Sequence, residues 1–320
     1  MQLLSTLRRS PAGNIIIVFV VAQIACVVFG LLFPQTFPYL QARSIGALLV
    51  AVSPLTIMAA GVGVLMISGE FDLSVGSTFA LAPYVMALLV NNWGIPAPAA
   101  IAAALAVGAG IGAINGVITL NARIPSFIAT LGAMMFWRGI LLALSQGASQ
   151  SFRPGGWIQA LFTGAIGPLQ AQFGWALVVV AGVYVLVHYH RLGNHIFAVG
   201  GNLQSAVAIG VKPYRVKLFC FVLVGLLAAF AGVVDAVESS SISPKQGQTM
   251  ELLAIAACVV GGISLTGGVG SIIGVLFGTG LLFTIQTVLF LLRAPGEYLD
   301  AFVGLLIVVA VVFNRVTRKE

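Results

Sequence analysis

Long apolar runs dominate this 320-residue chain and constrain its fold more than any other feature. Hydrophobic residues make up 60% of the sequence and charged residues only 7%, whereas soluble domains carry roughly 25% charged residues. This composition cannot provide a water-compatible surface, so the sequence predicts an integral membrane protein. The runs are rich in leucine, valine and alanine and approach the roughly 20 residues of a spanning helix. They therefore predict an all-α bundle, because a transmembrane barrel would show short segments of alternating polarity.

The apolar runs predict about ten spanning helices in a single transmembrane domain, residues 1–320. The expected spans are 14–33, 45–67, 73–90, 97–120, 125–145, 173–190, 215–237, 251–266, 270–292 and 298–314. The first run is longer than the core of a signal peptide, so we expect it to remain as a helix. Cys26, Cys220 and Cys258 each lie alone in a different run. That placement is typical of small buried hydrophobic residues and not of a disulfide framework.

Positive charge is divided unevenly between the two sides that these spans define. With the N-terminus in the cytoplasm, ten of the fifteen lysines and arginines fall inside, four fall outside and Arg138 falls within a span. Bilayer topology favours this excess inside, so we expect an N-in, C-in orientation. The basic residues lie at the ends of apolar runs, so the net charge of +7 does not indicate nucleic-acid binding.

Two rows of glycines recur at four-residue spacing, one in the fourth expected span and one in the ninth. The rows are Gly108, Gly112 and Gly116, and Gly270, Gly274 and Gly278. Each row is followed by an Arg-x-Pro, at 123–125 and at 293–295. An inverted repeat of spans 2–5 and 7–10 would produce this pattern. Small residues that simply let helices approach closely would also produce it, and both interpretations predict close helix packing.

Several functional motifs are absent from the sequence. No lysine follows a glycine, so there is no Gly-Lys-Ser/Thr phosphate-binding loop, and any ATP that drives this chain is bound by another polypeptide. The eight acidic residues lie near span ends, which disfavours ion-coupled transport. The three histidines cluster near the end of the sixth span without an adjacent acid or cysteine, so we expect no metal site. No nucleophile, base and acid occur together to indicate catalysis.

The stretch "ISGEFDLSVGS", residues 67–77, places two carboxylates between two apolar runs. Asp72 can cap the helix that follows, where the helix N-terminus favours its charge. A glycine-interrupted break between spans is also where transporters expose polar groups to a pathway. The residues alone leave both roles open for Asp72.

The segment 191–214, on the expected cytoplasmic side, predicts a short helix that does not span the membrane. Gly200 and Gly201 break the chain, Asn202 is a suitable N-cap, and "LQSAVAIG" reads as about two helical turns before Pro213. The segment's small residues would fit a groove on a soluble partner. A helix lying on the bilayer surface is the alternative. The residues in question are Gly201, Asn202, Ser205, Ala206, Ala208 and Gly210.

Four segments, in order, resemble the permease subunits of bacterial ABC importers of the ribose, xylose, arabinose and autoinducer-2 type. They are "GEFDLSVGS" (69–77), "NARIPSFIATLGAMMFWRG" (121–139), "AVGGNLQSAVAIGV" (198–211) and "ELLAIAACVVGGISLTGGVGSIIG" (251–274). The resemblance runs over nearly the whole chain. It implies a helix arrangement like that of the cobalamin importer's membrane subunit, in the bacterial inner membrane. The chain departs from the family pattern at Glu70, where a glycine is usual, and at Phe71, where an isoleucine is usual.

The resemblance also implies the partners. A second permease, identical or paralogous, would complete the pathway, a cytoplasmic ABC ATPase would bind Mg-ATP, and a periplasmic solute-binding protein would deliver the solute. The segment 191–214 would then be the coupling segment that docks on the ATPase. No cofactor is expected on this chain, which is a transporter subunit and not an enzyme.

We expect a small polyhydroxylated solute, with a monosaccharide as first candidate. Autoinducer-2, a nucleoside or a branched-chain amino acid, and an ion-coupled carrier mechanism, are the alternatives. The expected pathway residues are Glu70, Asp72, Ser74, Asn115, Ser126, Phe127 and Thr130. Phe127 would form an apolar wall among polar groups. Structural roles are equally open, since Asn115 could bond a neighbouring helix and Ser126 and Thr130 their own backbone.

Overall fold

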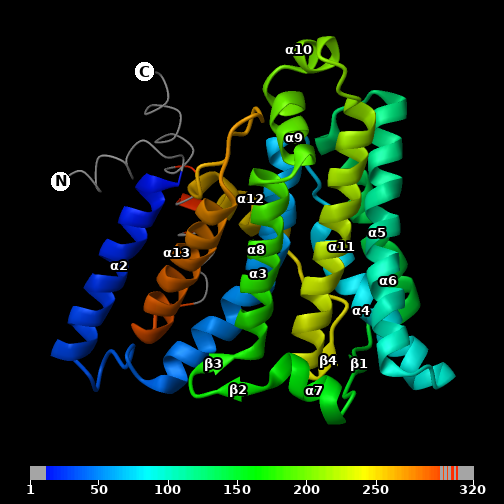
Figure 1. Cartoon of the computed structure of the whole chain (residues 1–320). Helices are drawn as coiled ribbons and strands as arrows, with labels where there is room; N and C mark the ends of the chain where they lie inside the picture. The colour runs from blue at the N-terminus through cyan, green and yellow to red at the C-terminus, as the bar shows by residue number, and fades with distance from the viewer. Residues whose placement is uncertain (1–11, 296–297, 299–300, 302–303, 306–307, 309–320) are drawn as a thin grey trace.

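The computed structural model describes residues 12–295 together with positions 298, 301, 304, 305 and 308. Within these residues the chain is a bundle of long helices with four two-residue strands (Figure 1). The elements are α2 (Gly13–Leu32), α3 (Ala42–Ile67), α4 (Val75–Trp93), α5 (Ala97–Ala122), α6 (Ser126–Ser145), β1 (Gln150–Ser151), α7 (Gly156–Thr163), β2 (Ala165–Ile166), β3 (Leu169–Gln170), α8 (Ala171–His188), α9 (Arg191–Gly201), α10 (Leu203–Ala208), α11 (Pro213–Ser239), β4 (Ser241–Ile242), α12 (Met250–Val260) and α13 (Ile272–Leu291).

Eight of the described helices are long and apolar enough to cross a membrane, which confirms the predicted all-α integral membrane class. Helices are the expected solution because the backbone must satisfy its own hydrogen bonds in lipid. In Figure 1, α9 and α10 lie at one end of the bundle, and α7 and the β2–β3 hairpin lie at the other. We call these the α10 end and the α7 end. The tenth expected span, 298–314, lies largely outside the described residues.

The eighth expected span differs from the structure. Its helix, α12, covers 11 residues and stops at Val260, and the chain then folds back through turns to α13. Eleven residues rise only about 16 Å, so α12 alone does not cross a hydrocarbon layer of about 30 Å. Gly262 and Gly267, at φ of +89° and +83°, permit this reversal, because side-chain-bearing residues rarely adopt such angles.

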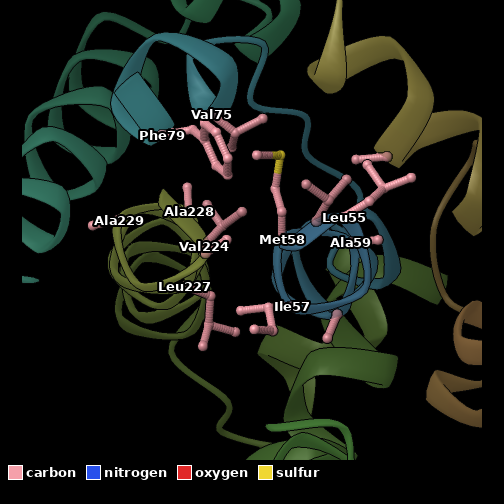
Figure 2. Close-up of a cluster of buried hydrophobic side chains, with 14 of the residues drawn as sticks. Leu55, Ile57, Met58, Ala59, Val75, Phe79, Val224, Leu227, Ala228 and Ala229 are labelled. Carbon is pink, nitrogen blue, oxygen red and sulfur yellow. The ribbon is translucent and has the colours of Figure 1, made fainter. Parts of the chain in front are cut away.

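Helices α3, α4 and α11 form the centre of the bundle, and every residue of α3 from 52 to 67 is buried. Figure 2 shows this core, in which Ile57 and Met58 of α3 face Val224 and Leu227 of α11 while Phe79 closes the cluster from α4. Helix α2 lies at the edge of the bundle beside α13 (Figure 1), and most of its residues are exposed. The three cysteines are free and buried, as predicted.

The glycine rows pack against two different helices. A Cβ at Gly112 of α5 would lie 2.1 Å from the Phe221 carbonyl oxygen of α11, so only glycine permits this approach. In α13, a Cβ at Gly278 would lie 2.3 Å from the Ala257 carbonyl oxygen of α12. An inverted repeat of spans 2–5 and 7–10 would make α13 the counterpart of α5 and α3 the counterpart of α11. The glycine row on α13 should then pack against α3, as the row on α5 packs against α11. The shared spacing therefore reflects packing and does not support the repeat, which stays a prediction.

Candidate functional site

The stretch 68–74 forms a tight turn between α3 and α4. Gly69 adopts a φ of +84°, and the amides of Gly69 and Glu70 donate back to carbonyl oxygens in the last turn of α3. After Gly69 the chain runs into the bundle along α6, and α4 starts at Val75. The turn therefore places its polar residues inside the protein.

Asp72 is the centre of a buried hydrogen-bond network. Its Oδ1 accepts bonds from the amide and the hydroxyl of Ser74, both at 2.7 Å, and its Oδ2 accepts one from Asn115 Nδ2 at 3.0 Å. Asn115 Nδ2 also donates to Ser74 Oγ at 2.7 Å. All three side chains are at most 1% exposed. Burial raises the pKa of the Asp72 carboxyl, and the hydrogen bonds from Ser74 and Asn115 oppose that rise.

The bond from Ser74 places Asp72 in the turn just before α4, where it satisfies an amide two residues ahead. Ser74 itself is the N-cap of α4 and makes no side-chain bond to the helix amides. Asp72 thus stabilises the start of α4 from outside the helix. These bonds are sufficient for the capping role predicted from the sequence. A pathway role for Asp72, Ser74 and Asn115 stays a prediction.

Two hydroxyls of α6 hold the main chain of the same turn. Ser126 Oγ accepts from the amide of Phe71 at 3.0 Å, and Thr130 Oγ1 accepts from the amide of Leu73 at 3.1 Å. Thr130 also donates to the Ser126 carbonyl oxygen at 2.7 Å, the local bond anticipated from the sequence. Phe127, between these positions, is 50% exposed and lies outside the network.

Glu70 forms an ion pair with Lys217 of α11. The Lys217 Nζ and Glu70 Oε1 atoms are 2.5 Å apart, and the side chains are only 16% and 14% exposed. Glu70, which departs from the family pattern, thus has a partner 147 residues away in sequence. A mostly buried lysine needs such a partner, because an unpaired charge is costly to bury.

Sequence reasoning missed a second turn, residues 243–249, which leads into α12. Arg138 of α6 donates through Nη1 to the carbonyl oxygens of Pro244 and Gln246, both at 2.9 Å, and through Nη2 to that of Gly76 at 3.0 Å. The guanidinium therefore joins this turn to the first helical turn of α4. A charged residue within an apolar span was the sequence signal for this position.

The segment after α9 forms the expected short helix. Asn202 caps α10, because its Oδ1 accepts from the Ser205 amide at 2.9 Å, and Gly210 ends the turn with a φ of +86°. Ala206, however, is 1% exposed and faces its own chain. Three large apolar side chains are exposed on α10 and the residue after it, Leu203, Val207 and Ile209, beside the exposed polar residues Gln204 and Ser205.

The α10 end is joined to the membrane helices through close glycine contacts. A Cβ at Gly200 would lie 1.8 Å from the Ile67 carbonyl oxygen, which also accepts a bond of 2.8 Å from the Gly268 amide. A Cβ at Gly268 would lie 2.4 Å from Gly201 Cα. Three segments distant in sequence therefore touch backbone to backbone beside α10.

Two cavities, of about 380 and 450 Å³, lie away from these turns. The first lies between α2, α3 and α13 and includes Gln23, Tyr39 and Thr284 in its wall. The second lies at the α7 end beside Arg43 and Glu238. None of the residues predicted to line a pathway contributes to either of these two cavities.

Comparison with known proteins places the chain among transport proteins. A family model described as "Branched-chain amino acid transport system / permease component" matches residues 44–311. The autoinducer 2 import system permease protein of Enterobacter sp. (strain 638) is 34% identical over 91% of this chain and 84% of its own length. The corresponding proteins of Escherichia coli (strain K12 / DH10B) and Yersinia enterocolitica are also 34% identical, over 86% and 81% of this chain and 80% and 72% of their own.

No solved structure matches the chain significantly. The family match covers most of the helical bundle, including both turns and α10. This chain therefore belongs to the family of branched-chain amino acid transport system permease components, and it is a multi-pass permease of the inner membrane.

Proposed function

We propose that this chain is the translocation subunit of an ABC importer that carries a small polyhydroxylated solute inward, driven by Mg-ATP hydrolysis on a partner subunit. A monosaccharide is the first candidate solute, in keeping with the four segments that resemble sugar permeases. Autoinducer 2 is the second candidate, favoured by the names of the relatives.

One observation carries the coupling part of the proposal. Helix α10 lies at the tip of the bundle (Figure 1), and Leu203, Val207 and Ile209 are 47%, 54% and 75% exposed there. Apolar side chains gathered at the tip of a membrane protein favour a docking surface for a soluble partner. We assign this surface to the ATPase, which places the α10 end in the cytoplasm and agrees with the charge bias of the sequence.

The remaining partners follow from this assignment. A periplasmic binding protein would deliver the solute at the α7 end, and a second permease, identical or paralogous, would complete the pathway. Closure of the ATPase on ATP would move α10, and the glycine contacts of Gly200 and Gly268 would pass that motion to α3 and α13.

The sharpest test places a charge on the exposed face of α10. Val207→Glu should leave the amount of chain in the membrane unchanged, release the ATPase during purification and lower uptake at least ten-fold. Val207→Ala is the matched control. Ala206→Glu would be a poorer test, because the new charge would be buried in this chain. A Val207→Glu transporter that retains its ATPase and normal uptake contradicts the coupling assignment.

The energy source and the solute need separate measurements. Inverted vesicles that move solute under a proton gradient without ATP would indicate an ion-coupled carrier instead. Identification of the ligand on the binding protein, by mass spectrometry of the purified protein, would separate monosaccharide from autoinducer 2, nucleoside and branched-chain amino acid.

A further inference from the structure

We propose that the second turn, residues 243–249, lines the solute pathway and that Gln248 and Thr249 contact the solute. This inference rests on the proposed function, because it names a binding site for the solute of that permease. It goes beyond the sequence prediction, in which none of the pathway residues came from this turn.

The packing of α12 on α13 gives the depth of the turn. Close contacts of Gly274 with Gly261 and of Gly278 with Ala257 show that the two helices run antiparallel. Thr249 lies twelve residues before Gly261. At 1.5 Å per residue, Thr249 is therefore roughly 20 Å from the start of α13 and 10 Å from its far end.

Arg138 gives an independent measure of the same depth. It is the thirteenth residue of the 20-residue helix α6, about 18 Å from the Ser126 end. Its guanidinium bonds directly to the carbonyl oxygens of Pro244 and Gln246. Both measures place the turn inside a hydrocarbon layer of about 30 Å.

The exposure of the turn is unusual for that depth. Gln248 and Thr249 are exposed, as is Lys245 on the same turn. Among the described residues the Gln248 carboxamide has no hydrogen-bond partner, and the Thr249 hydroxyl donates only to the adjacent Gln248 carbonyl oxygen. Polar groups at membrane depth are costly against lipid and are found facing protein or a water-filled cavity. The geometry therefore points to an aqueous pathway beside this turn.

The turn is also held in a strained, fixed shape. Thr249 adopts a φ of +68°, an outlier for a β-branched residue, and Gly247 adopts +73°. The hydrogen bonds from Arg138 hold the turn in this shape. The turn also packs closely on α4, where a Cβ at Gly76 would lie 2.5 Å from the Gly247 carbonyl oxygen. Strain that surrounding structure maintains is typical of ligand-binding segments, because a fixed site loses less entropy when it binds.

The chemistry of the two side chains fits a neutral polyol. A carboxamide offers donors and an acceptor, and a hydroxyl offers both functions on one atom. Adjacent sugar hydroxyls, which also donate and accept, complement such a pair. Neither side chain carries a charge, so neither requires an ionic solute.

A labelling experiment tests whether the turn faces water. Gln248→Cys and Thr249→Cys, in the full chain within membrane vesicles, should react with a membrane-impermeant cationic methanethiosulfonate reagent. The native cysteines are buried and provide the background. Ile24→Cys is the matched control, since Ile24 is 57% exposed near the middle of the peripheral helix α2 and should face lipid. Labelling of the turn no faster than that of Ile24→Cys overturns the proposal.

An uptake experiment tests contact with the solute. The chain is co-expressed with its ATPase and binding protein and assayed with labelled D-ribose, D-xylose, L-arabinose and autoinducer 2. Gln248→Ala and Thr249→Ala should each lower uptake of the transported probe about ten-fold, as expected for one lost hydrogen bond. Thr249→Ser, which keeps the hydroxyl, should retain uptake.

The two experiments separate the proposals. Unchanged uptake by both alanine variants overturns the contact assignment even when the cysteines react. If the unmodified transporter imports none of the four probes, the proposed solute class fails. In that case the labelling experiment still tests the pathway. Reaction of the cysteines in the turn supports an aqueous pathway there, and lack of reaction contradicts it.

Discussion

Replacing Gly112 by alanine tests how closely α5 must approach α11. The new Cβ would lie 2.1 Å from the Phe221 carbonyl oxygen, whereas ordinary contact begins at 3.4 Å, so the backbones must separate locally by about 1.3 Å. Overpacking costs about 1–3 kcal/mol, and the upper end applies because the obstacle is backbone. The higher helix propensity of alanine offsets at most about 1 kcal/mol of this destabilisation. We therefore expect Gly112→Ala to lower the free energy of unfolding by about 2 kcal/mol.

Gly110→Ala is the matched control, on the same helix two residues away. Nothing lies within 4 Å of a Cβ at Gly110, so this variant should remain within about 1 kcal/mol of the unchanged chain. Both are measured by equilibrium unfolding in mixed micelles of a mild detergent and dodecyl sulfate, followed by tryptophan fluorescence. Equal stability of the two variants would refute the argument that backbone approach, and not small size alone, requires glycine at 112.

Three further predictions concern the polar turns. Glu70→Gln and Lys217→Met should each lower the free energy of unfolding by about 2 kcal/mol in the same unfolding experiment, less than the 3–5 kcal/mol expected for a fully buried pair. The double variant should lose less than the sum of the two single losses. Strict additivity would contradict the pairing. Arg138→Met should lower the free energy of unfolding by about 3 kcal/mol, roughly 1 for each of the three bonds that Arg138 donates, and Arg138→Lys should recover part of this loss. Full recovery by Arg138→Lys would show that the fork geometry is irrelevant. Asn115→Leu should lower the free energy of unfolding by about 2–3 kcal/mol, because it removes the donor to the buried Asp72 Oδ2 and Ser74 Oγ. An unchanged unfolding midpoint would count against the network.

The sequence was sufficient for most of the helical fold, because apolar runs of spanning length have few alternatives in lipid. It was insufficient for the stretch after Val260. Residues 261–271 are apolar and rich in glycine, so hydropathy extends the span, while Gly262, Gly267 and Gly268 turn the chain back at positive φ. Hydropathy measures only the preference for lipid, and that preference says nothing about backbone direction.

The candidate site was predictable where its interactions are local. The Asp72–Ser74 bond spans two residues and the Asn202 cap three, so side-chain type and spacing indicate both. The contacts of Glu70 with Lys217 and of Arg138 with the second turn join residues roughly a hundred or more positions apart. No local pattern records such pairs, and only the packing of α6 and α11 brings them together.

Helix α6 supports both polar turns, and this links the α10 end to the interior of the bundle. Its hydroxyls bind the first turn, and Arg138 bonds both to the second turn and to Gly76, at the start of α4. The turn 68–74 is also joined to α11 through the Glu70–Lys217 ion pair. It lies against the loop after α12, where a Cβ at Gly267 would be 2.9 Å from Gly69 Cα. Packed contacts of this density shift together and do not deform independently. A partner that displaces α10 therefore acts on a unit that includes the second turn, residues 243–249, so the proposed solute site can respond to docking from well inside the membrane.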